Sequence, residues 1–320
     1  MKTLTIVSPC FNEEKNIPIF IDQVLDLKKK LLEKIEIDLI IVDDYSSDNS
    51  IDIIKDFINK YPWIKILKCP RNLGVFRATY LGLKIAKGEL IVPMLPVDLQ
   101  DPINALYEMI ILKEEKKVTG VFGKKIIREE NFFLSSLRNF FYTILNIFSV
   151  RKINHNVGEF GVIDRWVIDE CIKRNDYYPF IRGMIFNITE DILLYEYTWK
   201  SRIYGTSNFN LFSLYDSALN GFISSGAQFF RPLTFIGFFL SIFSIIFAIA
   251  NIIIYILNKS LFSVPGIATI IVILCFFFGF LFIFLGFLGE YLMAIHAQVR
   301  GLDKFHINDF SKKENKEKTL

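Results

Sequence analysis

The segment LTIVSPCFNEE, residues 4–14, begins as an apolar run and ends in polar and charged residues. Further apolar runs follow it, at residues 37–42, 64–67, 90–94 and 118–122. Amphipathic stretches separate these runs, at residues 17–32, 50–59, 76–86 and 103–113. This alternation is typical of a mainly parallel sheet that is covered by helices on both faces. The sequence therefore predicts an α/β domain over residues 1–230, with ligands bound beyond the carboxyl ends of the strands.

Polar residues follow the first two predicted strands, where such a sheet binds ligands. The second strand is followed by Asp43-Asp44-Tyr45-Ser46-Ser47-Asp48. Adjacent carboxylates at a strand end repel each other, so they indicate a ligand that offers hydrogen-bond donors. An alternative interpretation is that Ser46 or Ser47 caps a helix and that Asp48 complements the helix dipole.

A third polar cluster, PVDLQDP at residues 96–102, follows the fourth predicted strand. Asp98 and Gln100 are two residues apart, and their oxygens suit Mg²⁺ or Mn²⁺ beside phosphates. The alternative is a helix start, with Asp101 as the N-cap and Pro102 in the first turn. The three histidines are scattered, and this argues against a zinc site or a histidine-based triad.

The composition limits the class of protein. There are 37 Lys and Arg residues against 34 Asp and Glu, which gives a net charge of +3 and no basic excess of the size that nucleic-acid binding requires. The 4 cysteines lie far apart in the sequence and form no CxxC pair. We therefore expect reduced structural thiols in a protein that faces the cytosol, and no nucleic-acid partner.

The apolar residues are concentrated towards the C-terminus. Residues 233–257 and 264–289 contain no charged side chain. At about 1.5 Å rise per residue each segment would span roughly 37 Å or more as a helix, which is enough to cross a ~30 Å hydrocarbon core. Residues 131–150 and 209–230 are also rich in apolar side chains and predict helices that lie in the lipid headgroup plane, with a buried core helix as the alternative for each.

The flanking charges predict the orientation of these segments. Arg231 precedes the first apolar segment, and Arg300 and Lys304 follow the second. Because positive charge favours the cytoplasmic side, we expect a two-helix transmembrane hairpin over residues 231–295 with both ends inside. Residues 296–320 are then expected to form a cytoplasmic tail. The N-terminus does not resemble a signal peptide, so the α/β domain is predicted to stay in the cytoplasm.

A series of short motifs runs along nearly the whole chain. In order, the motifs are Pro9-x-Phe11-Asn12-Glu13-Glu14, Val42-Asp43-Asp44-x-Ser46-x-Asp48, Arg71-Asn72-x-Gly74, Asp98-Leu99-Gln100-Asp101-Pro102, Gly158-Glu159-Phe160, Asp164-Arg165, Phe180-Ile181-Arg182-Gly183, Arg202-x-x-Gly205-x-Ser207 and Gly286-x-x-Gly289-Glu290-Tyr291. The series resembles glycosyltransferase family 2. More closely, it resembles the bacterial polyprenyl-phosphate glycosyltransferases related to dolichol-phosphate mannose synthase.

The resemblance implies a GT-A fold and the transfer of a sugar from a nucleotide-sugar donor to a polyprenyl phosphate, with inversion at the anomeric carbon. It implies that Pro9, Phe11 and Glu13 line the nucleoside and that Asp43 and Asp44 reach the base or the ribose. It also implies that Asp98, helped by Gln100, holds Mg²⁺ or Mn²⁺ on the donor diphosphate. That metal would neutralise the leaving group.

The resemblance also implies an acceptor site. Arg128, Arg138 and Arg202 are the residues expected to hold the acceptor phosphate, because arginine forms charge-assisted hydrogen bonds with phosphate, although solvent-exposed surface positions are the alternative for each. Glu159 stands where the family usually has Asp and is expected to act as a base or to orient the acceptor. The implied location is the bacterial inner (cytoplasmic) membrane, in contact with membrane lipid. A homo-oligomer is also implied, and the product is expected to serve surface glycan or lipid modification.

The sequence departs from the family pattern around this site. Pro96 replaces the first Asp of the usual Asp-x-Asp-Leu-Gln-Asp-Pro segment, Asn208 replaces a usual Lys, and Asn156 replaces a frequent Asp. Two alternatives stand beside the main interpretation. One is direct transfer to a glycan or glycolipid hydroxyl. The other, which Pro96 supports, is a non-catalytic paralogue that binds lipid phosphate.

Overall fold

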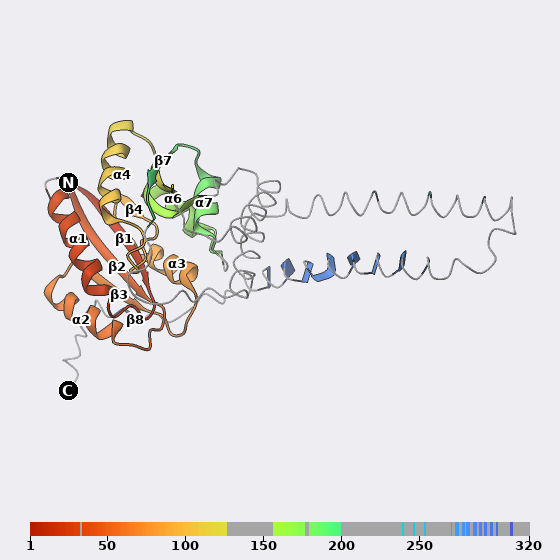
Figure 1. Ribbon diagram of the computed structural model, residues 1–320, viewed down its shortest axis with the longest axis horizontal. Coiled ribbons are helices and arrows are strands. Elements are labelled where there is room, and N and C mark those ends of the chain that lie inside the picture. Colours follow the sequence, from red (N-terminus) through yellow and green to blue (C-terminus); the bar gives the residue numbers. More distant parts are fainter. Residues whose placement is uncertain are drawn as a thin grey trace.

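The computed structural model describes residues 1–32, 34–126, 156–176 and 179–199, scattered helical residues between 239 and 299, and residues 308–309. The described residues form an 8-stranded sheet with the strand order β7-β5-β6-β4-β1-β2-β3-β8 (Figure 1). The strands are β1 (Lys2–Cys10), β2 (Ile35–Asp43), β3 (Ile64–Lys68), β4 (Leu90–Val92), β5 (Gly120–Lys125), β6 (Val157–Asp164), β7 (Ile192–Tyr197) and β8 (Asn308–Asp309).

Most strands of the sheet run in the same direction. β1 pairs in parallel with β2 and β4, and β2 pairs in parallel with β3. β6 is antiparallel to both β4 and β5, so β5 has the direction of β4, and β7 is parallel to β5. The carboxyl ends of β1, β2, β4, β5 and β7 therefore meet at one edge of the sheet, together with the amino end of β6.

Helices cover both faces of the sheet and enclose two apolar cores (Figure 1). Phe20, Leu106 and Phe160 lie in the core beneath α1, α2 and α4, and Leu83, Phe122 and Ile185 lie in the core beneath α3, α6 and α7. The helices are α1 (Ile17–Leu31), α2 (Ser50–Lys60), α3 (Val75–Ile85), α4 (Ile103–Lys116), α6 (Arg165–Lys173) and α7 (Ile181–Ile188). The result is the three-layer α/β architecture that the alternating pattern predicts.

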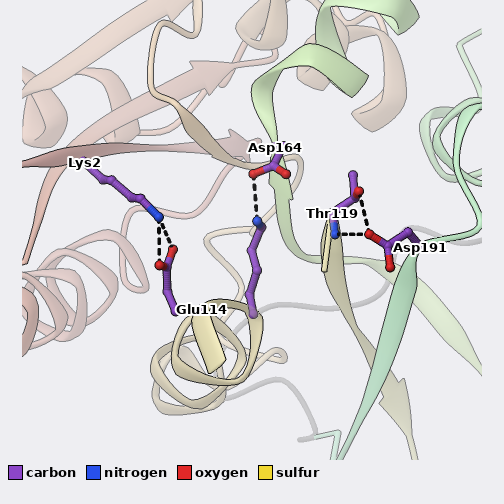
Figure 2. A network of polar contacts seen from close by, with 6 residues as sticks. Lys2, Glu114, Thr119, Asp164 and Asp191 are labelled. Carbon is purple, nitrogen blue, oxygen red and sulfur yellow. Dashed lines mark hydrogen bonds and ion pairs between the residues drawn. The ribbon is translucent and has the colours of Figure 1, made fainter. Parts of the chain in front are cut away.

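Polar contacts fasten the amino edge of the sheet, opposite the edge at which the carboxyl ends meet (Figure 2). Lys113 on α4 donates to Asp164 at the end of β6 over 2.7 Å, and this ion pair is partly buried. Thr119 donates from both its backbone nitrogen and its hydroxyl to Asp191, over 2.8 and 2.9 Å. These contacts tie α4 to β6 and the start of β5 to the start of β7.

The predicted strands and helices before residue 123 are confirmed, with small changes at their ends. The helix expected at residues 17–32 is α1, which ends at Leu31, and the strand expected at residues 90–94 is shorter. The pattern did not predict β6, α6, α7, β7 or β8.

The described cysteines, Cys10, Cys69 and Cys171, are free and buried. Burial raises the pKa of both the Cys69 and the Cys171 thiol to about 12.

The predicted membrane-associated segments lie mostly outside the described residues. This applies to all of residues 131–150 and 209–230 and to most of residues 233–257 and 264–289. Within the described part of the chain, no helix combines the length and the hydropathy needed to cross a membrane. One part of the expected tail, residues 308–309, pairs with β3 as an antiparallel edge strand.

Candidate active site

The loops after β1 and β2 are joined by hydrogen bonds at the carboxyl edge of the sheet. The Asn12 amide donates to the Ser46 hydroxyl over 2.9 Å, and the Ser47 amide donates to the Asn12 side-chain oxygen over 2.8 Å. Asn12 and Tyr45 have left-handed backbone conformations, with φ of 55° and 68°. Such conformations are uncommon outside glycine and often occur where a loop is shaped for a ligand.

Glu13 and Glu14 extend this contact towards α2. The Glu13 amide donates to the Ser50 hydroxyl over 2.9 Å, and the Glu14 amide donates to the Asp48 carboxylate over 3.1 Å. The Glu13 carboxylate accepts a hydrogen bond from the Asn16 side chain. Glu13 therefore helps to hold the start of α1. The resemblance implies a second role for it, in contact with the nucleoside.

The capping interpretation of the serines is wrong. α2 begins at Ser50, and its N-cap is Asn49, which forms no side-chain cap. The Ser46 hydroxyl accepts the Asn12 amide instead, so it joins two loops rather than starting a helix. Asp48 does accept the Ser50 amide over 3.0 Å, as a residue near a helix start can.

Asp44 connects the end of β2 to the start of α3. It is buried, and its two carboxylate oxygens accept the Leu73 amide over 2.7 Å and the Gly74 amide over 2.9 Å. Burial raises the pKa of Asp44 to about 6, against the effect of these two hydrogen bonds, and the charge of Asp43 raises it further. Each carboxylate oxygen can accept a second hydrogen bond, so Asp44 keeps acceptor capacity for a ligand hydroxyl.

The loop after β4 runs along the end of β1. The Val97 amide donates to the Pro9 carbonyl over 3.4 Å. Asp98 is 7% exposed, and its carboxylate accepts the Gln100 amide over 3.2 Å across Leu99, whose φ is 61°. Because β1 lies between β4 and β2, the Asp98 loop and the Asp43–Asp44 loop flank the end of the same strand.

The side chains of this loop suit a divalent cation that is shared with a bound ligand. In the part of the chain that the structure describes, no group of three or more His, Cys, Asp or Glu side chains could hold a metal. Pro96 stands where a second carboxylate would complete the usual segment. Mg²⁺ usually binds through one or two carboxylates and substrate phosphates, so Asp98 and the Gln100 amide oxygen fit a cation that binds together with a diphosphate.

Glu159 lies near the start of β6 at the same edge of the sheet. It is 9% exposed, and its carboxylate is 3.9 Å from Nε of Arg182. Arg182 is also buried, donates to the Val157 carbonyl and lies 5.1 Å from the centre of the Phe180 ring. The guanidinium is therefore fixed beside Glu159, and it supplies the opposite charge that a buried carboxylate needs.

Asp101 does not cap α4, contrary to the alternative interpretation of its sequence. The N-cap of α4 is Pro102, with no side-chain cap, and the Asp101 carboxylate accepts the Tyr197 hydroxyl instead. Lys125 lies 3.7 Å from the same carboxylate oxygen and 4.7 Å from the centre of the Trp199 ring.

The described site residues from the sequence meet at the carboxyl edge of the sheet. Pro9, Phe11 and Glu13 follow or end β1, Asp43 and Asp44 follow or end β2, Asp98 and Gln100 follow β4, and Glu159 lies on β6. Arg128, Arg138 and Arg202 lie outside the described residues, so their role stays a prediction.

Sequence reasoning missed some residues at this edge. Lys125 and Tyr197 were not predicted, and Arg182 was noticed only as part of a motif. Lys125 had one signal, because it follows the fifth predicted strand in the same way as the acidic residues follow the others. Tyr197 had none, because its partner Asp101 is 96 residues away in the sequence.

Comparison with known proteins agrees with this arrangement. Residues 5–172 match Glycosyl transferase family 2. The chain is 30% identical to the SfII prophage-derived bactoprenol glucosyl transferase of Shigella flexneri, over 95% of this chain and 97% of that protein. It is 29% identical to the prophage bactoprenol glucosyl transferase homolog of Escherichia coli, over 97% of this chain and 99% of that protein.

A solved structure shares the fold. Glucosyl-3-phosphoglycerate synthase from Mycobacterium tuberculosis, crystallised with Mn²⁺, uridine diphosphate and phosphoglyceric acid, superposes with a TM-score of 0.50 at 14% identity, over 71% of this chain and 78% of that chain. The family match covers more than half of the chain and includes Asp44, Asp98 and Glu159. The α/β domain is therefore a GT-A fold, and the chain belongs to glycosyl transferase family 2 and is a glycosyltransferase.

Proposed function

We propose that the enzyme transfers a sugar from a nucleotide-sugar donor to a polyprenyl phosphate at the cytoplasmic face of a bacterial membrane, with inversion at the anomeric carbon. The observation that carries the proposal is the buried Asp98 on a loop that flanks the end of β1 opposite Asp44. The similarity to bactoprenol glucosyl transferases over nearly the whole chain supports a polyprenyl-phosphate acceptor and makes glucose the first sugar to test.

The loops after β1, β2 and β4 would bind the donor. Asp43 and Asp44 would accept hydrogen bonds from the base or the ribose, and Pro9 and Phe11 would line the nucleoside. Asp98 and Gln100 would hold Mg²⁺ or Mn²⁺ against the donor diphosphate. When bound, the metal supplies positive charge that stabilises the departing nucleoside diphosphate.

Glu159 would orient the acceptor rather than remove a proton. A phosphate monoester has a second pKa near ~6, so it is mostly dianionic at neutral pH and already a nucleophile. Its oxygen must be held close to the anomeric carbon, and this is a matter of positioning. Arg182 beside Glu159 supports this role, because the ion pair fixes the carboxylate in one place.

Attachment to the membrane is part of the proposal. The uncharged segments 233–257 and 264–289 support two spans, and Arg231 and the cations after residue 299 support cytoplasmic ends. The described residues between 239 and 299 are all helical, and apolar side chains among them are exposed, including Ile246 and Phe278. An acceptor phosphate at the membrane surface would then meet the domain at residues 1–230. A homo-oligomer remains a prediction.

The test uses the full-length protein in vesicles that contain undecaprenyl phosphate. Vesicles are incubated with a panel of nucleotide sugars and with Mg²⁺, Mn²⁺ or a chelator, and mass spectrometry of the lipid extract identifies the product. We expect a sugar on undecaprenyl phosphate only when a divalent cation is present. Transfer to a lipid hydroxyl, or no transfer with any donor, would contradict the proposal and favour the alternatives described above.

Asp98→Asn tests the metal assignment. We expect activity to fall at least about a hundredfold, because stabilisation of the leaving group by a metal is worth several kcal/mol. The matched control is Asp52→Asn on α2, whose side chain is 77% exposed and pairs with Lys55. Full activity of Asp98→Asn would show that Asp98 does not bind the metal.

A further inference from the structure

A buried polar cluster joins the loop that carries Asp98 to the ends of strands β5 and β7. The Asp101 carboxylate accepts a hydrogen bond from the Tyr197 hydroxyl and lies 3.7 Å from the Lys125 ammonium. The side chain of Asp101 is 10% exposed, and that of Lys125 is 17% exposed. A buried carboxylate is costly unless it is paired and hydrogen-bonded, and these two groups meet both requirements.

The cluster connects three separate parts of the chain. Asp101 ends the loop that carries Asp98, Lys125 is the last residue of β5, and Tyr197 is the last residue of β7. Lys125 and Tyr197 are register partners in the sheet, and the Ile126 amide donates to the Tyr197 carbonyl over 3.0 Å. The segments that leave these two strands lead to the predicted acceptor residues Arg128 and Arg202.

The position of the Tyr197 ring is specific. A Cβ atom at Gly123 on β5 would lie 2.4 Å from the ring, so only glycine leaves room for it there. The ring also meets Phe160 edge-on, with the ring centres 5.4 Å apart. Phe160 directly follows Glu159 on β6, so the two side chains lie on opposite faces of the sheet, and the Tyr197 ring packs against the chain neighbour of the residue expected to orient the acceptor.

Helix capping does not explain the placement of Asp101. The residue stands directly before Pro102, where a side-chain cap for α4 would be expected, yet α4 has no side-chain cap. The carboxylate is turned to the Tyr197 hydroxyl instead, and a hydrogen bond to an ionised group is among the stronger hydrogen bonds in proteins.

We propose that Tyr197 is a positioning residue that acts through Asp101, with Lys125 as the opposite charge. It fixes the loop carrying Asp98 relative to β5 and β7, and thereby fixes the donor and its metal relative to the acceptor. The consequence for the reaction rests on the proposed function, whereas the consequence for the loop does not.

Hydrogen exchange of the ligand-free protein tests the effect on the loop. The variant is Tyr197→Phe, which keeps the ring and removes only the hydroxyl. We expect the amides of residues 97–101 to exchange about tenfold faster, since one charge-assisted hydrogen bond is lost. The matched control is Tyr195→Phe, on the same face of β7, and residues 10–16 serve as an internal reference. Unchanged exchange at residues 97–101 would overturn the inference.

The second readout is the metal concentration that gives half-maximal transfer in the vesicle assay. We expect this concentration to rise about five- to tenfold in Tyr197→Phe and to stay unchanged in Tyr195→Phe. If exchange in the loop accelerates but the metal concentration does not change, the hydroxyl is merely structural and the inference fails. If the wild type shows no transfer, the proposed function fails, and hydrogen exchange alone decides whether Tyr197 positions the loop.

A double-mutant comparison shows whether Tyr197 acts through Asp101. Asp101→Ala removes the acceptor of the Tyr197 hydroxyl, so we expect Tyr197→Phe to add little to its effect on loop exchange. Additive effects of the two substitutions would show that Tyr197 acts by another route and would overturn the inference.

Discussion

Substitution of Glu159 separates two roles that a carboxylate can have beside an acceptor. Glu159→Gln keeps the shape of the side chain and removes its charge and basicity. In the structure this carboxylate is 9% exposed and is 3.9 Å from Nε of Arg182. The substitution therefore affects both the reaction and a nearly buried ion pair, and the two effects are measured separately.

The expected effect on the rate is small. At pH 7.5 a phosphate monoester with a second pKa near ~6 is about 97% dianionic, so almost no acceptor molecule needs a base. Where a proton must be removed, a general base contributes about 10²–10⁴-fold. We therefore expect Glu159→Gln to lower the transfer rate by less than about tenfold, through weaker positioning of the acceptor alone.

The expected effect on stability is moderate. Removing one partner of a buried ion pair costs about 3–5 kcal/mol, because the remaining charge is left without compensation. A glutamine oxygen still faces the Arg182 guanidinium, so we expect a loss of about 2 kcal/mol in the free energy of unfolding. Against a typical total stability of about 5–15 kcal/mol, we expect this loss to leave enough folded protein for the rate to be measured.

The assay is single-turnover transfer to undecaprenyl phosphate in vesicles between pH 6 and pH 8.5, with thermal unfolding measured on the same samples. The matched control is Glu114→Gln, which removes an exposed charge that pairs with Lys2 over 2.7 Å (Figure 2). We expect the wild type and Glu159→Gln to lose activity together below about pH 6, as the acceptor becomes protonated. A loss of about a thousandfold or more in a folded variant that still binds the lipid would refute this reasoning and make Glu159 the base.

Two further predictions concern stability. The folded pKa of Asp44 is about 6, above its unfolded value near ~4, so its contribution to stability is fully present below about pH 4 and is lost as the pH rises through 6. The stability of the wild type relative to Asp44→Asn should therefore fall by about 3 kcal/mol between pH 4 and pH 7, and a rise in unfolding measurements would contradict the assignment. Gly82→Ala would place a Cβ atom 2.5 Å from Val7 and 2.8 Å from Val42, so we expect a loss of about 1–3 kcal/mol in thermal unfolding, and an unchanged midpoint would show that the sheet can move aside.

The sequence was most informative where the signal is local. The amphipathic period predicted α1 and α2 to within one residue, because each buries one face against the adjacent sheet. The direction of β6 carried no such signal. It pairs with both β4 and β5 after a long intervening segment, and an apolar strand has the same pattern whether it runs parallel or antiparallel.

The candidate site shows the same difference between local features, which the sequence predicts, and tertiary contacts, which it does not. Polar residues after β1, β2 and β4 predicted its location, because carboxyl ends of parallel strands meet at one edge. The contacts of those residues could not be predicted. Asp44 binds amides that lie 29 and 30 residues away, and Asp101 turns from the helix beside it towards Tyr197, so each depends on tertiary structure.

The two-residue strand β8 has a consequence for solubility. Without it, β3 would be the outermost strand, with a row of backbone amides and carbonyls open to other chains. Asn308 and Asp309 pair with Lys68 and Leu67 and cover part of that row. Both are weak strand formers, and a very short polar edge is a poor template for another strand. Residues 308–309 thus leave less of the β3 edge open to pairing with another chain.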